Sequence, residues 1–288
     1  MLRKTPAAEN ESHYMKHNFN KFVANSLLSG VLLLASVAAH AWGYDGHRIA
    51  ADVASGLLTQ QARIRVSELL MGGSLADVAS YMDEERKSLK QKIPGSDKWH
   101  YDNIPVCGKA TAAACPNGNC ATARIEQLSK LLADRKTDQA TRVFAVKALV
   151  HLIADIHQPL HAADDEDHGG NDIAIGSRNL HSEWDSGMVK KLIRRQSAGE
   201  YAAGLLSRYG NQIRNTQSGN ASAWAAESHE LAVRVAYGAL PGFACGRGHL
   251  DITRLPASYY DTALPVVESQ LVRAGGRIAF ILNQAFAK

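Results

Sequence analysis

The sequence predicts a mainly α-helical protein with a single domain, and three observations lead to that fold class. Apolar residues recur at helical spacing over long segments, no run of residues alternates as an amphipathic β-strand does, and neither a repeat nor a low-complexity linker divides the chain. Residues 42–288, which remain after a predicted leader, have a length that suits one domain with its own core.

The expected helices follow from apolar spacing and from signals at their ends. They cover residues 49–58, 64–70, 122–132, 181–195, 198–215, 220–239 and 258–285. Gly72-Gly73 ends the second of these. One more helix is expected to run from a cap at Thr137 to His157, because Pro159 cannot continue it.

The first 41 residues have the layout of a signal peptide. Lys16 and Lys21 supply a positive start, residues 27–38 form an apolar stretch, and small residues precede a cut after Ala41. The apolar stretch is too short to cross a membrane, and no later one reaches about 18 residues. We therefore expect a leader at 1–41 that is removed, and a mature domain at 42–288 that is periplasmic or secreted and has no stable membrane association.

Cleavage after Ala41 would give the chain a new N-terminus at Trp42. The free α-amine and the carbonyl oxygen of Trp42 can chelate a metal ion, since a neutral amine is a nitrogen donor. His47 lies five residues further on, close enough to supply the next ligand. Processing would then create part of a metal site.

Charge and cysteines limit the partners and the compartment. The precursor carries a net charge of +4. The leader contains four Lys or Arg and two Asp or Glu, so its loss leaves a net charge of +2. This modest charge excludes a polybasic surface for binding nucleic acid. The four cysteines all follow the leader, as an oxidising compartment allows. They permit three pairings; Cys115 and Cys120 flank a turn-rich loop that a local bridge could close, which would leave Cys107 and Cys245 as a long-range pair.

Two stretches of the chain are rich in metal-binding residue types. His151 and Asp155 are four residues apart, as are His181 and Asp185, so each pair projects from one face of a helix. His161 follows a proline break and can return toward the first pair. Imidazole nitrogen and carboxylate oxygen are both good zinc donors. The pattern predicts a zinc site.

Asp83 and His100 are further candidate ligands, although each candidate has a simpler interpretation when it is taken singly. A His/Asp pair at helical spacing is usually a surface pair, Asp83 adjoins Glu84 and Glu85 in an acidic stretch, and His100 is an ordinary loop histidine. The joint pattern favours a polynuclear metal centre, because five of the nine histidines in residues 42–288 fall in these arrangements.

In this order the motifs resemble the type I zinc-dependent nucleases, a family of fungal single-strand-specific nucleases, plant bifunctional nucleases and bacterial relatives. The stretches that carry the resemblance are Trp42-Gly43 to His47-Arg48, His151 to Asp155 with Gln158-Pro159-Leu160-His161, Gly169-Gly170-Asn171, and Asn179-Leu180-His181 with Trp184-Asp185. The helical remainder of the chain has a suitable length.

The resemblance implies a mainly α, phospholipase C/nuclease-like domain with a trinuclear zinc cluster at the bottom of a cleft. Three Zn²⁺ would be held by nine residues: Asp83, His100, His151 and Asp155 around one ion; Trp42 and His47 around a second, with Asp155 bridging; and His161, His181 and Asp185 around a third. It also implies disulfides between Cys107 and Cys245 and between Cys115 and Cys120.

The function implied by the resemblance is hydrolysis of single-stranded DNA and RNA to 5′-phosphorylated products. Nucleotides would be further substrates if the protein also acts as a 3′-nucleotidase. Asp83 would orient the attacking water, Arg86 would neutralise charge on the phosphate, and Asn171 would hydrogen-bond to it. We expect a monomer.

Tyr101 and Asn103 are the candidates for base recognition. Tyr101 follows the ligand His100 and would stack on a base, which favours single strands because a duplex hides its base faces. Family members commonly place an Asp shortly after this aromatic residue to contact the base edge, whereas here the order is Asp102-Asn103.

Two other functions stay open. A zinc-dependent phospholipase C has a similar fold and an N-terminal Trp, but it has a longer gap to the next His and typically a final Glu ligand, where this chain has Asp185. A non-catalytic exported zinc-binding protein would need neither Arg86 nor Asn171. His157 and His168 are expected to be supporting or solvent-exposed residues.

Overall fold

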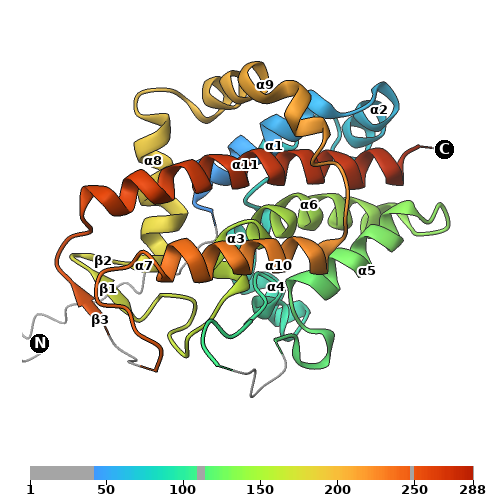
Figure 1. Ribbon diagram of the computed structural model, residues 1–288. Helices are drawn as coiled ribbons and strands as arrows, with labels where there is room; N and C mark the ends of the chain where they lie inside the picture. Colours follow the sequence, from blue (N-terminus) through green and yellow to red (C-terminus); the bar gives the residue numbers. More distant parts are fainter. Residues whose placement is uncertain (1–41, 109–113, 247–249, 288) are drawn as a thin grey trace, which may run out of the picture. The chain divides into compact units, whose positions relative to one another are not determined.

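The computed structural model describes residues 42–108, 114–246 and 250–287, so the predicted leader lies outside the described residues. The described part is mostly helical (Figure 1), as the sequence predicts. The helices are α1 (Tyr44–Leu57), α2 (Gln60–Leu69), α3 (Tyr81–Glu84), α4 (Arg86–Lys92), α5 (Ala121–Ala133), α6 (Gln139–Ile156), α7 (Leu180–Ser182), α8 (Met188–Ile193), α9 (Ala198–Arg214), α10 (Ala221–Leu231) and α11 (Ala257–Ala285).

Helix α6 lies in the core. It packs against α5, α11, α3 and α10, and nearly all its residues from Ala145 to Ile156 are buried. A helix that is apolar around its whole circumference must be covered on all sides. The ligand candidates on α6 are therefore held by a rigid, closely packed element.

Helix α11 closes the core over α1 and α6. Its approach to α1 depends on Gly275, where an added Cβ would lie 2.4 Å from Cγ1 of Val53. Pro265 lies inside α11 without ending it. Packing on several helices outweighs the local cost of that proline.

The helix ends differ in detail from the sequence prediction. Asp138, not Thr137, caps α6, and its side chain accepts a hydrogen bond from the backbone N–H of Thr141 at 2.9 Å. The segments expected at 181–195 and 220–239 are each interrupted by a π-helical turn, at Glu183–Gly187 and Ala232–Tyr237. A π turn keeps the helical apolar pattern nearly intact, so the spacing does not reveal it.

The structure also contains a small sheet, which the sequence does not predict because no run of residues alternates between apolar and polar. Strands β1 (Ile173–Ile175) and β2 (Arg178–Asn179) form an antiparallel hairpin, and β3 (Leu250–Ile252) adds in parallel to β1, so the order is β2-β1-β3. Strands of two or three residues are too short to alternate visibly. The sheet contacts α7, which leads into the second ligand-rich segment (Figure 1).

Two disulfides fasten the loops around the core. Cys107 pairs with Cys245 across 138 residues, and Cys115 pairs with Cys120 in a local loop before α5, as the resemblance implied. A bridge between distant residues restricts the unfolded chain most. Within the described ranges, none of the helices combines the length and apolarity that crossing a membrane requires.

Candidate metal centre

Helix α6 presents two candidate ligands on one buried face. His151 and Asp155 are one turn apart, and Nε2 of His151 lies 3.2 Å from Oδ2 of Asp155. The other ring nitrogen of His151, Nδ1, donates to the carbonyl oxygen of Ala79 at 2.8 Å. That bond fixes the tautomer, so in the neutral ring the lone pair of Nε2 is directed at the carboxylate.

Asp155 is the centre of a cluster built from distant segments. Its Oδ1 lies 2.9 Å from Nε2 of His47, on α1, and its Oδ2 lies 2.9 Å from Nδ1 of His100, in the loop after α4. Asp83, on α3, completes this cluster: its Oδ1 is 3.7 Å from both Nδ1 of His100 and Nε2 of His151. We call these five residues the Asp155 group.

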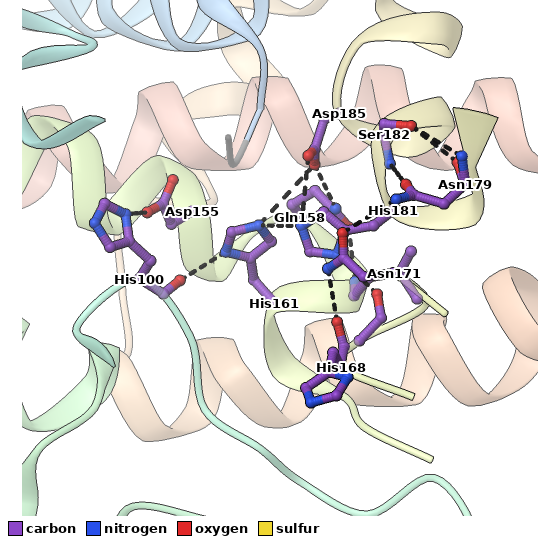
Figure 2. Close-up of polar contacts among 12 residues, drawn as sticks. His100, Asp155, Gln158, His161, His168, Asn171, Asn179, His181, Ser182 and Asp185 are labelled. Carbon is purple, nitrogen blue, oxygen red and sulfur yellow. Dashed lines mark hydrogen bonds and ion pairs between the residues drawn. The ribbon is translucent and has the colours of Figure 1, made fainter. Parts of the chain in front are cut away.

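A second cluster, the Asp185 group, consists of His161, His181 and Asp185. Nε2 of His161 lies 3.1 Å from Nε2 of His181, which is 3.4 Å from Oδ2 of Asp185. The Nδ1 atoms of the two rings donate to the carbonyl oxygens of His100 and Gly169, at 2.6 and 2.7 Å. Both Nε2 atoms of the neutral rings therefore carry lone pairs that face each other at close range (Figure 2). A cation between them would replace that repulsion with attraction.

Local structure brings the Asp185 group together. The side chain of Asn179 accepts from the backbone N–H of Ser182 at 2.8 Å and starts α7. The π turn that follows carries Asp185 and aims its carboxylate at His181 and His161 (Figure 2). π turns are frequent at functional sites because they redirect a side chain without ending the helix.

His161 departs from the expectation drawn from its position alone. Its position suggested that it could return toward His151 and Asp155, whereas the resemblance placed it with His181 and Asp185; its Nε2 faces that second group. It follows Pro159 in a short 3₁₀ turn, and its Nδ1 bond to the carbonyl oxygen of His100 is the link between the two groups.

Gln158 and Gly169 support the Asp185 group, and neither is among the predicted site residues. The fully buried Gln158 donates from Nε2 to Oδ1 of Asp185 at 2.7 Å, while its Oε1 accepts from the backbone N–H of Leu160. Gly169 has φ of +64°, and a Cβ there would lie 2.7 Å from the carbonyl oxygen of Leu160. Its own carbonyl oxygen orients His181. Both residues lie in motifs that carry the family resemblance, and those motifs were the sequence feature that could have identified them.

The two groups differ in how their charges balance. Burial opposes ionisation of Asp155, yet His151, His100 and His47 hold its pKa well below the usual value. Burial also lowers the pKa of His151, but the carboxylates of Asp155 and Asp83 raise it to about 9. The Asp155 group is thus a set of compensating charges.

The Asp185 group lacks that compensation. Burial raises the pKa of the Asp185 carboxyl well above its usual value, against the hydrogen bond from Gln158. Burial, reinforced by the neighbouring His161, lowers the pKa of His181 to about 3. Burial also lowers the pKa of His161, so it favours the neutral form of each side chain in this group. A bound cation would favour the ionised carboxylate and the neutral imidazoles that ligation requires.

The donor atoms fit metal ions by chemistry and by spacing. In three sets of residues all ligand atoms lie within 4.8 Å of one another: His47, Asp83 and His151; His100, His151 and Asp155; His161, His181 and Asp185. Zinc bonds of about 2.0–2.1 Å in a tetrahedron put neighbouring ligand atoms about 3.3 Å apart. The distances of 2.9–3.7 Å between neighbouring donors of the Asp155 group bracket that value. Oδ1 of Asp83 and Nδ1 of His47 are moreover buried, and neither has a hydrogen-bond partner within the described part of the chain.

The N-terminal end of the described chain lies beside the Asp185 segment. The backbone N–H of Gly43 donates to the carbonyl oxygen of Asp185 at 2.8 Å, and the adjoining residue, Trp42, is fully buried. An added Cβ at Gly46 would lie 2.9 Å from Cβ of Trp42, so the glycine makes room for the indole on α1. This arrangement holds Trp42 close to two segments: helix α1, which carries His47, and the π turn, which carries Asp185.

A cavity of about 140 Å³ opens above both groups. His100 lines it from the Asp155 group, and His161 and His181 line it from the Asp185 group. The four residues expected to contact substrate line the same cavity: Arg86, Tyr101, Asn103 and Asn171. Tyr101 is half-buried and Asn103 is exposed. The structure therefore gathers the predicted substrate residues at one opening.

Asn171 is held by its own loop. Its Nδ2 donates to the carbonyl oxygen of His168 at 2.7 Å, and its Oδ1 accepts from Asn179 at 3.3 Å. A primary amide has a second N–H, which is the group that Asn171 can offer a phosphate. Arg86 likewise donates to the carbonyl oxygen of Asp97, at 3.3 Å.

His157 and His168, the two histidines set aside in the sequence, have different surroundings. His157 is fully buried, donates from Nδ1 to the carbonyl oxygen of Ile153 and accepts from Arg277 at Nε2. It is a core residue outside both groups. His168 is exposed but lines the cavity.

Comparison with known proteins identifies the family. The S1/P1 nuclease family model matches residues 42–287. Nuclease P1 of Penicillium citrinum is 28% identical, over 84% of this chain and 97% of its own length. Endonuclease 2 of Arabidopsis thaliana is 27% identical, over 88% and 94%, and nuclease S1 of Aspergillus oryzae is 25% identical, over 89% and 96%. Since the family model covers nearly all of the described chain, this protein belongs to the S1/P1 nuclease family.

Proposed function

We propose that the protein is a zinc-dependent endonuclease that hydrolyses single-stranded DNA and RNA to 5′-phosphorylated products. One observation carries the proposal: two groups of buried imidazoles and carboxylates border one cavity, and Arg86 and Tyr101 line that cavity with them. Metal ligands, a cation and an aromatic ring at one opening suit a substrate with both phosphates and bases.

Three zinc ions would be held by the nine predicted ligands. Asp83, His100, His151 and Asp155 would hold the first, Trp42 and His47 the second with Asp155 shared, and His161, His181 and Asp185 the third. The distances within the Asp155 group support a shared carboxylate, because its two oxygens face different imidazoles. When bound, the ions would lower the pKa of water and offset phosphate charge.

The chain's own residues would orient the reactants. Asp83 would accept a hydrogen bond from the attacking water at Oδ1, which is buried without a hydrogen bond within the described chain. Arg86 would neutralise charge on the phosphate oxygens from across the cavity. Asn171 would donate its second amide N–H to the same phosphate. These groups favour in-line attack on phosphorus by holding the phosphate in one orientation.

Tyr101 and Asn103 would bind the base next to the cleaved bond. Tyr101 has a face at the cavity, and stacking on a base contributes about 1–3 kcal/mol for any base. Asn103 is exposed at the same opening and can hydrogen-bond to a base edge. A site of this kind favours unpaired strands, and it would also accept a 3′-nucleotide.

Export would precede activity. We propose cleavage after Ala41, so that the mature protein begins with Trp42 in the periplasm or outside the cell. The buried position of Trp42 and the bond from Gly43 to Asp185 support a role for this terminus in the site.

The test is hydrolysis by the correctly processed protein. We expect cleavage of single-stranded DNA that is lost with a chelator, restored by zinc, and yields 5′-phosphate ends. Phosphatidylcholine is assayed in parallel. Zinc-dependent cleavage of the lipid alone would identify a phospholipase C, and zinc binding without turnover of either substrate would identify a non-catalytic zinc protein.

A further inference from the structure

His168 occupies an unusual position at the rim of the cavity. Its side chain is 81% exposed, yet it lines the same cavity as Arg86, His161 and His181. In Figure 2 it lies beyond Asn171, on the side away from Asp185. Among the residues that the structure describes, it belongs to neither ligand group.

The backbone at His168 is strained. Its φ is +55°, in the left-handed region that glycine adopts freely and other residues adopt at a cost of roughly 1 kcal/mol or more. The loop is held by contacts that do not need the imidazole: the carbonyl oxygen of His168 accepts from Asn171, and Asp164 accepts from the backbone N–H of Gly169. Glycine would adopt this φ without that cost, so replacing His168 with glycine should leave the loop intact.

The surroundings of the imidazole favour its charged form. Nδ1 of His168 pairs with Oδ2 of Asp172 at 2.6 Å, and this bond, with the negative charges of Asp172, Asp164 and Asp167, raises its pKa. Arg86 is the cation that shares the cavity. With Nδ1 engaged, Nε2–H is the donor that the ring can present to a ligand.

The size of the cavity indicates which part of a nucleic-acid strand would lie against His168. At about 140 Å³ the cavity is well below the roughly 300 Å³ of the smaller ligand pockets, so it holds only part of a nucleic-acid strand. The rest of the strand must run over the rim, and its phosphates are the anionic groups that recur along it. A carboxylate-paired surface imidazolium has little value for stability by itself.

We propose that His168 binds, through Nε2, a phosphate next to the one that is cleaved, and so favours strands over substrates with a single phosphate. This inference rests on the proposed nuclease function. It gives the protein a subsite outside the metal centre, with Asp172 as the residue that orients the ring.

The experiment compares His168→Gly and His168→Arg with the wild type on two substrates. One is a single-stranded oligothymidylate, and the other is a dinucleoside monophosphate, which has one phosphodiester and no flanking phosphate. For the exposed contact we expect His168→Gly to raise KM on the oligomer about two- to fivefold with kcat nearly unchanged. KM on the dinucleoside monophosphate should not change, and His168→Arg should restore oligomer binding.

Salt dependence gives a second readout. Loss of one phosphate contact on a single strand should reduce the slope of log affinity against log salt by about 0.7. The melting temperature of His168→Gly should not fall, since glycine relieves the strained φ. Arg65→Gln is the matched control, because Arg65 is also an exposed cation paired with a carboxylate, Glu68, but does not line this cavity. Its substitution should leave KM and the salt slope unchanged.

The outcomes separate the two proposals. Equal changes on both substrates, or an unchanged salt slope for His168→Gly, would overturn the subsite. If the wild type cleaves neither substrate with zinc, the nuclease function fails, and the subsite is then judged from fluorescence anisotropy of labelled oligothymidylate. A slope reduced by about 0.7 in that binding assay supports the subsite, and an unchanged slope contradicts it.

Discussion

The Asp155 group and the Asp185 group contain similar side chains but differ in how the charges of those side chains are balanced. Asp155 touches three imidazoles, and His151 is pulled toward its charged form by two carboxylates. In the Asp185 group one carboxylate is hydrogen-bonded to Gln158, and two imidazoles face each other through lone pairs. The first group can hold its geometry through internal ion pairs, whereas a bound cation would offset the facing lone pairs of the second.

This difference leads us to expect that the two groups would exchange bound metal ions at different rates. The Asp155 group draws on α1, α3, α6 and the loop after α4, so it forms only when the core is complete. The Asp185 group draws on the short turns between Pro159 and Gly187, at the edge of the cavity. Of the proposed sites, we expect the one in the Asp185 group to exchange its metal most readily.

The largest effect should come from the shared carboxylate. Asp155→Asn removes the charge that three buried imidazoles contact, and breaking a buried charge set lowers the stability of the folded protein by about 3–5 kcal/mol. Because Asp155 is a shared ligand, the rate of hydrolysis should fall by more than the roughly 10- to 100-fold that loss of a supporting residue typically costs. We expect the variant to lose two zinc ions and Asp185→Asn to lose one, as measured by elemental analysis beside hydrolysis rates. Equal zinc loss in the two variants would remove the distinction between the groups.

A smaller effect should follow from the support of Asp185. Gln158→Leu removes the donor to Oδ1, and loss of such a supporting bond typically costs about 10- to 100-fold in metal affinity. Competition with a chelator should show one weakened zinc and two of normal affinity. Gln270→Leu is the control, since this buried glutamine donates to the carbonyl oxygen of His157 and to the hydroxyl of Ser228 rather than to a member of either group. Weakening of all three ions by Gln158→Leu would contradict a local role.

The smallest effect concerns His157, a buried histidine outside the two ligand groups of the described chain. His157→Gln should lower the free energy of unfolding by about 1–3 kcal/mol at pH 7, with zinc content unchanged. Burial, with the charge of Arg277, lowers the pKa of His157 to about 3. The unfolded chain therefore takes up a proton below about pH 6.5 that the native chain refuses. The stability difference between wild type and variant should shrink between pH 7 and 5, followed by urea unfolding; a growing difference would refute the assignment.

Helical periodicity explains why much of the site could be predicted from sequence. His151 and Asp155, like His181 and Asp185, are four residues apart, and that spacing brings their side chains together on a helix even through a π turn. The long helices were predictable for the same reason, since packing of an apolar face determines them.

The parts that were missed depend on contacts between distant segments. Spacing alone left the partner of His161 open, and only the resemblance placed it with His181 and Asp185. Its orientation depends on a 3₁₀ turn and on the carbonyl oxygen of His100, and neither leaves a periodic pattern. Strand β3 pairs with β1 from far along the chain and is three residues long. The rim position of His168 follows from a loop held by side-chain bonds, so spacing alone gave it no role.

We propose that a terminus exposed by processing joins these side chains around metal ions. The most direct measurement is the zinc content of the mature chain beginning at Trp42, compared with a chain that carries one extra residue before it. We predict three zinc ions per chain in the first and two in the second, with strongly reduced hydrolysis and an unchanged helical circular dichroism spectrum. Equal zinc content and equal activity in the two chains would contradict the account.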